Sequence, residues 1–409
     1  MNRTPLEDHV HDALHRRVDP IQHAPLSVTD VRRRAGRIQR RRTAVAGVAV
    51  AAVLAIAIPV GLSVNGPSQR SDVPPATQSP SPTPQLASGT VRVDPRTAEV
   101  ITESPVPLMD VDGPSLITSD GTIDLPRVFD TLTPYLDGWA GIAVQDEPDV
   151  PWSTIEFLDA DLDVQDGGGA ASGGLVVSPD GQRIAWSEYT GSQWQVVVAD
   201  PSGGAEPVYT TFPPAPESHR VEPVGFISAD EVAVRAFDDT TTTRTYAAGG
   251  GEPVEIPGLL EVDAASPATG AVAGLTDLSL KKKCSAVVDG LARTGARTWE
   301  TCDHRLGPFS DNGTYVVGTD PEADGYGPSA ITVLDGATGE EIVTFEAVLP
   351  RRTVGGFWTQ MAWVGDEALV VRMYAGDDTY VMRLGLDGSV QRIDIPSSGL
   401  SGLSVAVPS

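Results

Sequence analysis

Beyond residue 89, short runs of apolar and β-branched residues alternate with turns rich in Gly, Asp, Pro and Ser. The segment "LVVSPDGQRIAWSEYTGSQWQVVVAD", Leu175–Asp200, is typical and reads as strand, turn, strand, loop and strand. Apolar runs of this length, bounded by Asp/Gly turns, predict β-strands joined in hairpins. The spacing of apolar residues predicts no long amphipathic helix in this part of the chain.

The strongest hairpin pattern recurs seven times, and each copy places an Asp/Gly turn between two β-rich runs. The seven predicted hairpins are Thr90–Glu103, Thr154–Asp166, Gln195–Thr210, Arg244–Pro257, Cys284–Cys302, Ala330–Phe345 and Tyr380–Ile395. Most are preceded by another strand with its own turn, as in "ISADEVAVRAF" and "WVGDEALVVRMY". A period of about 40–50 residues with four strands in each repeat predicts an all-β, seven-bladed β-propeller, with six or eight blades as alternatives.

Two of these repeats resemble known propeller families. Ser178-Pro179-Asp180-Gly181, followed by "QRIAW", resembles the TolB-type repeat, and "LDGATGEEIVTF" (Leu334–Phe345) resembles the repeat of quinoprotein and lactonase-type propellers. The resemblance covers residues 90–408, with sharp motifs in only two or three of the predicted blades. It implies the propeller fold without implying one function, because propellers serve as enzymes, sensors and scaffolds.

The two ends of the predicted propeller indicate how the ring closes. Thr90–Glu103 has no strands before it, and the apolar run "GLSVAV" (Gly402–Val407) remains after the last hairpin. We expect Gly402–Val407 to be the inner strand of the first blade, whose outer strands come from Thr90–Glu103. This pairing would hide a strand edge and join the first blade to the last.

An uncharged segment of 22 residues, Thr43–Val64, precedes the propeller. At a rise of about 1.5 Å per residue a helix of this length spans a bilayer. Arg40–Arg42 lie on one side of it and only Arg70 on the other, which predicts a cytoplasmic N-terminus. The alternative is a cleaved signal peptide with Ala55-Ile56-Ala57 as its cleavage site, but both the leader and the apolar run are longer than usual.

This segment divides the chain into four parts: a basic cytoplasmic tail (1–42), a transmembrane helix (43–64), a disordered Pro/Ser/Thr-rich linker (65–89) and an extracytoplasmic propeller (90–409). His9, His11 and His15 of the tail are interpreted as solvated, since no cysteine accompanies them as a metal ligand. The abundance of Arg, Ala, Val and Gly, together with this layout, resembles membrane-anchored propeller proteins of actinobacteria.

Charge is distributed unevenly between these parts. Residues 1–42 contain ten arginines and five acidic residues, a net charge of +5. The whole chain carries −26, so residues 43–409 carry −31. A domain this acidic repels nucleic acid, so no nucleic-acid partner is expected.

The only two cysteines, Cys284 and Cys302, flank one predicted hairpin. Pairing them centres the intervening loop on residue 293, in the middle of "DGLARTGA". They would then face each other across antiparallel strands, within reach of a disulfide. An extracytoplasmic domain permits this bond, and the alternative is two buried free thiols.

Patterns of catalytic residues, cofactor sites and metal sites are not found. The predicted propeller has only His219 and His304, and the chain contains no nucleophile elbow, phosphate loop or Cys-x-x-Cys. Asp159–Gly168 superficially suggests a calcium loop, but Val164 occupies the Gly position and Ala170 the Glu position, which favours a solvated acidic turn. "SLKKKC" (Ser279–Cys284) is interpreted as the exposed start of a strand that could also dock an acidic partner.

The sequence therefore favours a single-pass membrane protein whose propeller acts as a binding, scaffold or sensor module. A protein, glycan or small ligand would bind at the mouth of the central channel. One alternative is a propeller enzyme of the lactonase or lyase type, with Ca²⁺ held by channel carboxylates. Another is a membrane regulator that acts through its tail. Three or more carboxylates at the channel mouth would favour the enzyme, whereas a rim of Trp or Tyr would favour binding.

Overall fold

The structure is a computed structural model, and it describes residues 86–395 and 403–405. Within the first range the gaps are 111–113, 145–152, 172, 179–180, 201–205, 217, 239–242, 280–281, 324–326 and 350–352. Every regular element of the described residues is a strand, and they include no helix able to cross a bilayer. The predicted tail, the predicted membrane helix and all but the end of the predicted linker lie outside the described residues.

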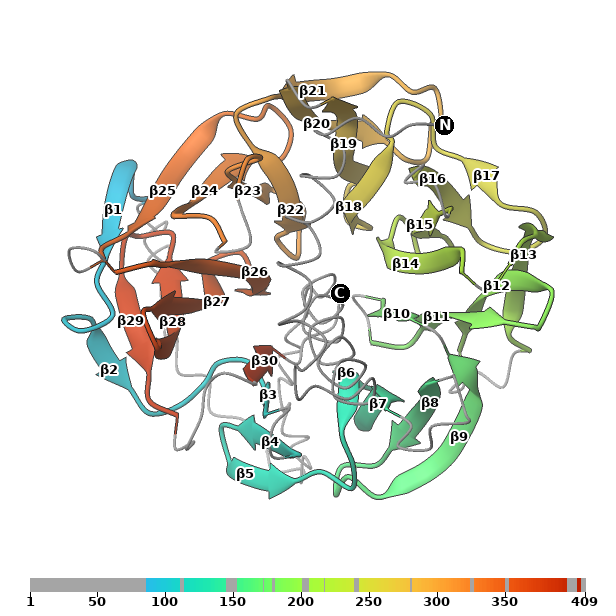
Figure 1. Cartoon of the computed structure of the whole chain (residues 1–409), viewed down its shortest axis with the longest axis horizontal. Coiled ribbons are helices and arrows are strands. Elements are labelled where there is room, and N and C mark those ends of the chain that lie inside the picture. Colours follow the sequence, from blue (N-terminus) through green and yellow to red (C-terminus); the bar gives the residue numbers. More distant parts are fainter. Residues whose placement is uncertain are drawn as a thin grey trace, which may run out of the picture. The chain divides into compact units, whose positions relative to one another are not determined.

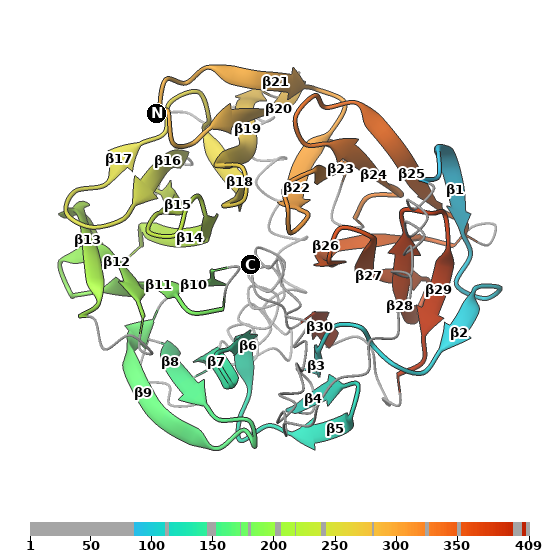
Figure 2. The same ribbon diagram turned by 180° about the vertical axis from the view of Figure 1, so that it is seen from behind.

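The described strands form seven sheets arranged as the blades of a ring, which confirms the predicted seven-bladed β-propeller (Figure 1). The view from behind shows the same order of blades around one axis (Figure 2). We number the blades in chain order and give the strands of each from the axis outward. Within a blade neighbouring strands are antiparallel, apart from two added strands described below.

Blades 2 to 4 each contain four consecutive strands. Blade 2 contains β6 (Phe129–Tyr135), β7 (Gly138–Ala143), β8 (Ser153–Leu158) and β9 (Val164–Ala171). Blade 3 contains β10 (Gly173–Val177), β11 (Ile184–Tyr189), β12 (Gln193–Ala199) and β13 (Val208–Pro214). Blade 4 contains β14 (Arg220–Phe226), β15 (Val232–Phe237), β16 (Thr243–Ala248) and β17 (Val254–Glu255).

Blades 5 to 7 follow the same plan, and blades 6 and 7 each gain a fifth strand. Blade 5 contains β18 (Glu261–Ser266), β19 (Ala271–Ser279), β20 (Lys282–Asp289) and β21 (Arg297–Thr301). Blade 6 contains β22 (Arg305–Phe309), β23 (Tyr315–Thr319), β24 (Ala330–Asp335), β25 (Glu341–Ala347) and β1 (Gly89–Val93). Blade 7 contains β26 (Gly355–Val364), β27 (Ala368–Ala375), β28 (Asp378–Gly385), β29 (Val390–Ile393) and β2 (Glu99–Ile101).

Blade 1 is built from both ends of the propeller. It contains β30 (Leu403–Val405), β3 (Leu108–Asp110), β4 (Ser115–Thr118) and β5 (Gly121–Asp124). The innermost strand, β30, pairs antiparallel with β3, so that Leu403 stands opposite Asp110 and Val405 opposite Leu108. The C-terminal run therefore closes the ring as an inner strand of the first blade, as the sequence predicts.

The prediction that Thr90–Glu103 forms a hairpin is wrong. Its two strands do not pair with each other: β1 is parallel to β25 of blade 6, and β2 is parallel to β29 of blade 7. A turn does form between them, where the backbone carbonyl of Asp94 accepts from the amides of Thr97 and Ala98. The turn carries the chain from the outer edge of one blade to that of the next. The outer hairpin of blade 1 is instead β4 and β5, and the other six predicted hairpins are the third and fourth strands of blades 2 to 7, counted from the axis.

Strands in the middle of a blade are buried on both faces because neighbouring blades cover them. Six consecutive residues of β27 are buried, and the first four residues of β11 and of β15 are buried as well. This explains why these strands read as continuous apolar runs in the sequence and lack strict alternation. By contrast, all four residues of the outermost strand β5 are exposed.

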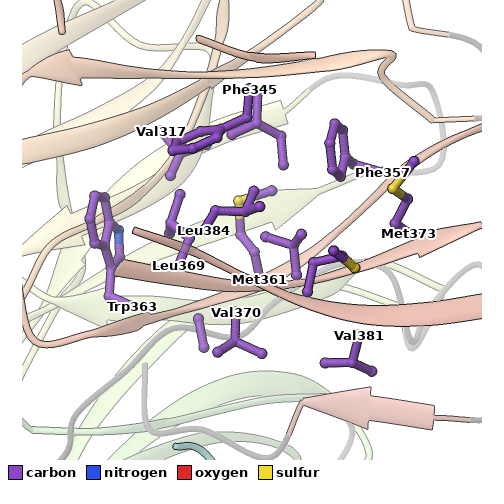
Figure 3. Close-up of a cluster of buried hydrophobic side chains, with 14 of the residues drawn as sticks. Val317, Phe345, Phe357, Met361, Trp363, Leu369, Val370, Met373, Val381 and Leu384 are labelled. Atoms are coloured by element: carbon purple, nitrogen blue, oxygen red, sulfur yellow. The ribbon is translucent and has the colours of Figure 1, made fainter. Parts of the chain in front are cut away.

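The apolar core consists of clusters that each lie between neighbouring blades. The largest joins blades 6, 7 and 1, and Figure 3 shows part of it, including Phe345 of β25, Phe357 and Trp363 of β26, and Leu384 of β28. Smaller clusters join the other neighbouring blades, for example blades 4 and 5. Packing between blades, and the two termini, therefore hold the ring together.

Ser178, the first residue of the TolB-like motif, comes directly after β10, and Ser310 has the corresponding place after β22. In blade 3 the Ser178 hydroxyl accepts a hydrogen bond from the amide of Arg183 (2.9 Å), and in blade 6 the Ser310 hydroxyl accepts from the amide of Tyr315 (3.1 Å). The Arg183 guanidinium also pairs with Asp230 in the corresponding turn of blade 4. This motif thus shapes a turn and ties one blade to the next.

Candidate functional site

The innermost strands of blades 2 to 7 share an irregularity that affects the side chains near the ring axis. In β18, Val262 pairs with Gly274 and Ala264 with Ala273, so Asp263 is an extra residue. Comparable bulges lie at Asp130 in β6, Gly174 in β10, Val224 in β14 and Gly307–Pro308 in β22. A β-bulge redirects side chains and is common beside functional sites.

Blade 7 has the widest of these bulges. The three residues Trp358–Gln360 of β26 stand opposite one residue of β27, Arg372. The Arg372 guanidinium carbon lies 5.0 Å from the centroid of the Trp358 ring. The centroids of the Trp358 and Tyr374 rings are 5.7 Å apart. A cation stacked on an indole at this distance stabilises the pair by about 0.5–2 kcal/mol.

A charged network lies where the innermost strands of blades 4, 5 and 6 begin. We call this end of the ring the leading face, and the end where these strands finish the trailing face. Arg235 of β15 pairs with Glu222 of β14 (2.9 Å) and with Glu261 of β18 (3.2 Å). Arg305 of β22 pairs with the same Glu261 (3.1 Å) and with the bulge residue Asp263 (2.6 Å). Two arginines and three carboxylates therefore link three consecutive blades.

Burial and charge act against each other in this network. Burial raises the pKa of the Asp263 carboxyl, and the neighbouring Arg305 counteracts part of that effect. Burial opposes the charge on Arg235, but Glu222, Glu261 and Asp263 together raise its pKa, so it remains a cation. The carboxylates, chiefly Asp263, likewise raise the pKa of Arg305. Because Arg305 keeps 42% of its side chain exposed while Asp263 keeps only 8%, Arg305 is the solvent-facing member of this pair.

Aromatic side chains lie at the same end of neighbouring blades, and some of them are buried. In blade 3 the buried Trp186 indole donates to Glu188 (2.8 Å), and the half-buried Tyr189 packs against the buried Trp194 with ring centroids 5.3 Å apart. In blade 4 the half-buried Phe237 lies 5.0 Å from the guanidinium carbon of Arg235. The leading face thus combines paired charges with the partly exposed rings of Tyr189 and Phe237, a composition suited to recognition of a ligand.

Both predicted disulfide cysteines are joined in the structure. The Sγ atoms of Cys284 and Cys302 are 2.06 Å apart. Cys284 comes directly before Ser285 of β20 and Cys302 directly after Thr301 of β21, and Ser285 and Thr301 are paired. The bond ties the outermost strand of blade 5 to its neighbour. These two sulfurs and the Glu300 carboxylate are the one group of potential metal ligands in the described residues, and disulfide sulfurs are not thiolate ligands.

The predicted acidic turn is built around Asp159. Its carboxylate accepts from the amides of Asp161 and Asp163 (3.0 Å each) and from the Gln165 side chain (2.5 Å). The hydrogen bonds use the Asp159 carboxylate to shape the turn, in keeping with the interpretation as a solvated acidic turn.

The other singled-out side chains have local partners. Lys283, from the predicted basic run, donates to the backbone carbonyl of Pro321 (3.1 Å) and lies 3.5 Å from Glu322, so it contacts blade 6. His304 contacts Glu341 (3.0 Å). The structure therefore brings neither residue to the charged network of the leading face. The three tail histidines lie outside the described residues.

The sequence did not reveal the network or the indole–guanidinium pair. Their only signal in the sequence is an isolated arginine inside a buried apolar run, followed two residues later by an aromatic residue. Arg235 with Phe237 and Arg372 with Tyr374 show this pattern in β15 and β27, the second strands of blades 4 and 7. A long charged side chain is rarely buried unless it is paired, so each arginine indicates partners elsewhere.

No protein-family model matches this sequence, and no curated protein matches it either. Three solved structures illustrate what the fold is similar to. TolB from Acinetobacter baumannii is 13% identical, with a TM-score of 0.39 over 74% of this chain and 66% of that one. The β-propeller domain of Cps50 (Swd1) from Myceliophteria thermophila is 13% identical, with a TM-score of 0.45 over 66% and 88%.

Prolyl oligopeptidase B from Galerina marginata is 11% identical, with a TM-score of 0.45 over 68% of this chain and 42% of that one. These proteins have different functions, and similarity at this level does not select among them. The seven-bladed arrangement rests on the strand pairing of this chain itself.

Proposed function

We propose that this chain is a membrane-anchored β-propeller that binds a ligand outside the cytoplasm, at the leading face of the ring. The observation that carries the proposal is the concentration of paired charges and aromatic side chains at this face. Five charged residues from three blades meet there, and Trp358 and Tyr374 of a fourth blade add aromatic surface. Sites of this composition, with fixed polar groups beside aromatic rings, are typical of recognition surfaces.

The state of the carboxylates favours binding over a calcium-dependent enzyme. Glu222, Glu261 and Asp263 meet the number of acids that such an enzyme would need. However, each already pairs with an arginine, and Ca²⁺ would have to displace the buried Arg235 and the half-exposed Arg305. The exchange would leave the buried guanidinium of Arg235 without its carboxylate partners, which opposes it.

Crosslinking from the two faces tests the proposed site. Leu260 lies immediately before β18 on the leading face, and Leu136 lies immediately after β6 on the trailing face. Their exposures are similar, at 41% and 48%, so they form a matched pair. With a photoreactive leucine analogue at either position in intact cells, we expect crosslinked products only from position 260. Equal crosslinking from both positions, or none from 260, would contradict the proposal.

The location is proposed from the apolar segment Thr43–Val64 and the arginines beside it. Protease added to intact spheroplasts should digest the propeller and leave a tag at Met1 protected. Protection of the C-terminus would show the opposite topology, and digestion at both ends would show a chain that does not cross the membrane.

A further inference from the structure

Trp358 differs from the large aromatic residues of the propeller core. Trp363 and Trp194 are 1% and 2% exposed, whereas Trp358 stays partly exposed beside the exposed Thr359. The widest bulge of the innermost strands places it there. A partly exposed indole in a distorted inner strand contributes little to the core, which makes a role in recognition the better explanation.

The Trp358 indole is held in one orientation by side chains of its own blade, blade 7. The guanidinium carbon of the buried Arg372 lies 5.0 Å from the centroid of the indole ring, and the centroid of the Tyr374 ring lies 5.7 Å from it. A platform fixed in this way loses little conformational entropy when a ligand binds, which favours affinity.

The charges around this platform favour a neutral ligand. Arg372 already stacks on the indole, so a second cation on the same ring would be repelled. Residues 43–409 carry a net charge of −31, which disfavours the approach of an anion. A ligand that is uncharged and still has both apolar and polar faces satisfies both conditions.

The surroundings of the indole are polar on the solvent side. Thr359, the next residue of the bulge, is exposed. A ligand that packs on the partly exposed indole therefore borders a polar residue and water, which suits a molecule that carries hydroxyls around an apolar face.

We propose that the bulge Trp358–Gln360 is a saccharide subsite, in which the apolar face of a neutral pyranose packs on the indole and its hydroxyls bind beside it. This inference rests on the proposed ligand binding at the leading face and names the ligand class. The C–H face of a pyranose matches the indole, and its hydroxyls serve as both donors and acceptors.

Binding is measured with the full-length chain in lipid nanodiscs, which avoids detergents that carry sugar headgroups. The probes are neutral tetrasaccharides of glucose, mannose and N-acetylglucosamine, with tetragalacturonate and tetralysine as charged probes. We expect at least one neutral tetrasaccharide to bind, and Trp358→Ala to weaken that binding at least tenfold. Trp358→Phe should retain part of the affinity and guards against a folding defect in the alanine variant. Trp299→Ala, on the outermost strand of blade 5, is the matched control and should bind as the parent does.

Two outcomes overturn the subsite: no neutral tetrasaccharide binds, or Trp358→Ala binds as tightly as the Trp299→Ala control. Binding of tetralysine or tetragalacturonate alone would also overturn it, since charge would then select the ligand. If any of these outcomes is found while crosslinks still form from position 260, the proposed ligand binding at the leading face stands and only the saccharide subsite is wrong.

Discussion

Blade 1 and the pair formed by blades 6 and 7 use the two ends of the chain in opposite ways. Blade 1 has four strands of three or four residues each, and its inner strand, β30, is supplied by the C-terminal segment. Blades 6 and 7 have five strands each, and their outermost strands β1 and β2 come from the N-terminal segment. The cluster that joins blades 6 and 7 to one side of blade 1 contains 22 buried apolar residues, whereas the cluster between blades 1 and 2 contains eight.

This difference shows where the ring is weakest. One terminus fills an inner edge that would otherwise be open, and the other covers two outer edges that already belong to complete blades. Losing the first removes part of a blade, whereas losing the second exposes only strand edges. We therefore expect local opening to begin at blade 1, whose four strands have only three or four residues each.

The largest expected effect comes from truncating the chain after Ser398. This removes β30 and exposes the inner edge of β3 in a blade whose strands have only three or four residues each. We expect a loss of several kcal/mol from the roughly 5–15 kcal/mol that stabilises a typical domain. Chemical denaturation of the purified protein measures the change in the free energy of unfolding.

Deletion of residues 65–85 is the control for this truncation, since it removes more residues without touching a described strand. It should leave the free energy of unfolding nearly unchanged. If truncation after Ser398 has as little effect as this deletion, closure by β30 does not stabilise the ring.

A pair of core substitutions compares the two regions directly. Phe345 and Leu116 are both fully buried, the first in the cluster of blades 6 and 7 and the second in that of blades 1 and 2. We expect Phe345→Ala to destabilise the protein by about 3–5 kcal/mol, and Leu116→Ala by about 2–3 kcal/mol because the thinner cluster can relax around the cavity. Urea denaturation of both variants tests the order, and a larger loss for Leu116→Ala would reverse the comparison.

Blade 5 offers a third arrangement, since none of the described terminal strands β1, β2 and β30 joins it and a disulfide holds its outermost strand. Closing a loop with a sequence separation of 18 residues stabilises a protein by about 3 kcal/mol in the chain-entropy model. The double variant Cys284→Ser/Cys302→Ser should lose about that much, at or below the loss for Phe345→Ala. Adding a reductant should destabilise the parent and leave the variant unchanged. If the reductant frees both thiols without moving the parent's denaturation midpoint, the bond contributes no stability.

The limits of prediction from the sequence follow from which features are local. Six outer hairpins and the closing strand could be predicted, because an Asp/Gly turn between apolar runs is a local signal. Thr90–Glu103 carries the same signal, but its partners lie more than 200 residues away, in β25 and β29. The hairpin of β4 and β5 was missed because its strands have only four residues each and few apolar side chains.

The candidate site shows the same limit more strongly. Cys284 and Cys302 could be paired because they flank one hairpin. Arg235 and Arg305, in contrast, meet at Glu261 only after three blades have assembled, and no spacing within one repeat connects them. The periodicity of the sequence predicts the strands of each blade, whereas the geometry of the ring determines which side chains of different blades meet.

The smallest expected effect concerns the boundary between blades 6 and 7, which share the largest apolar cluster. Burial, followed by the nearby Asp366 carboxylate, raises the pKa of Asp311 to about 6. The unfolded chain has the ordinary value of about 4, so between pH 4 and 6 the folded state binds more protons. The contribution of Asp311 to stability is therefore fully present below about pH 4 and is lost as the pH rises through about 6.

Asp311→Asn should reduce the fall in the free energy of unfolding across this range by about 1 kcal/mol, a value lowered to allow for solvent screening. Urea denaturation at several pH values measures the slope, with Asp120→Asn in the exposed turn of blade 1 as the control. An unchanged slope in Asp311→Asn would show that the boundary between blades 6 and 7 is insensitive to this carboxyl.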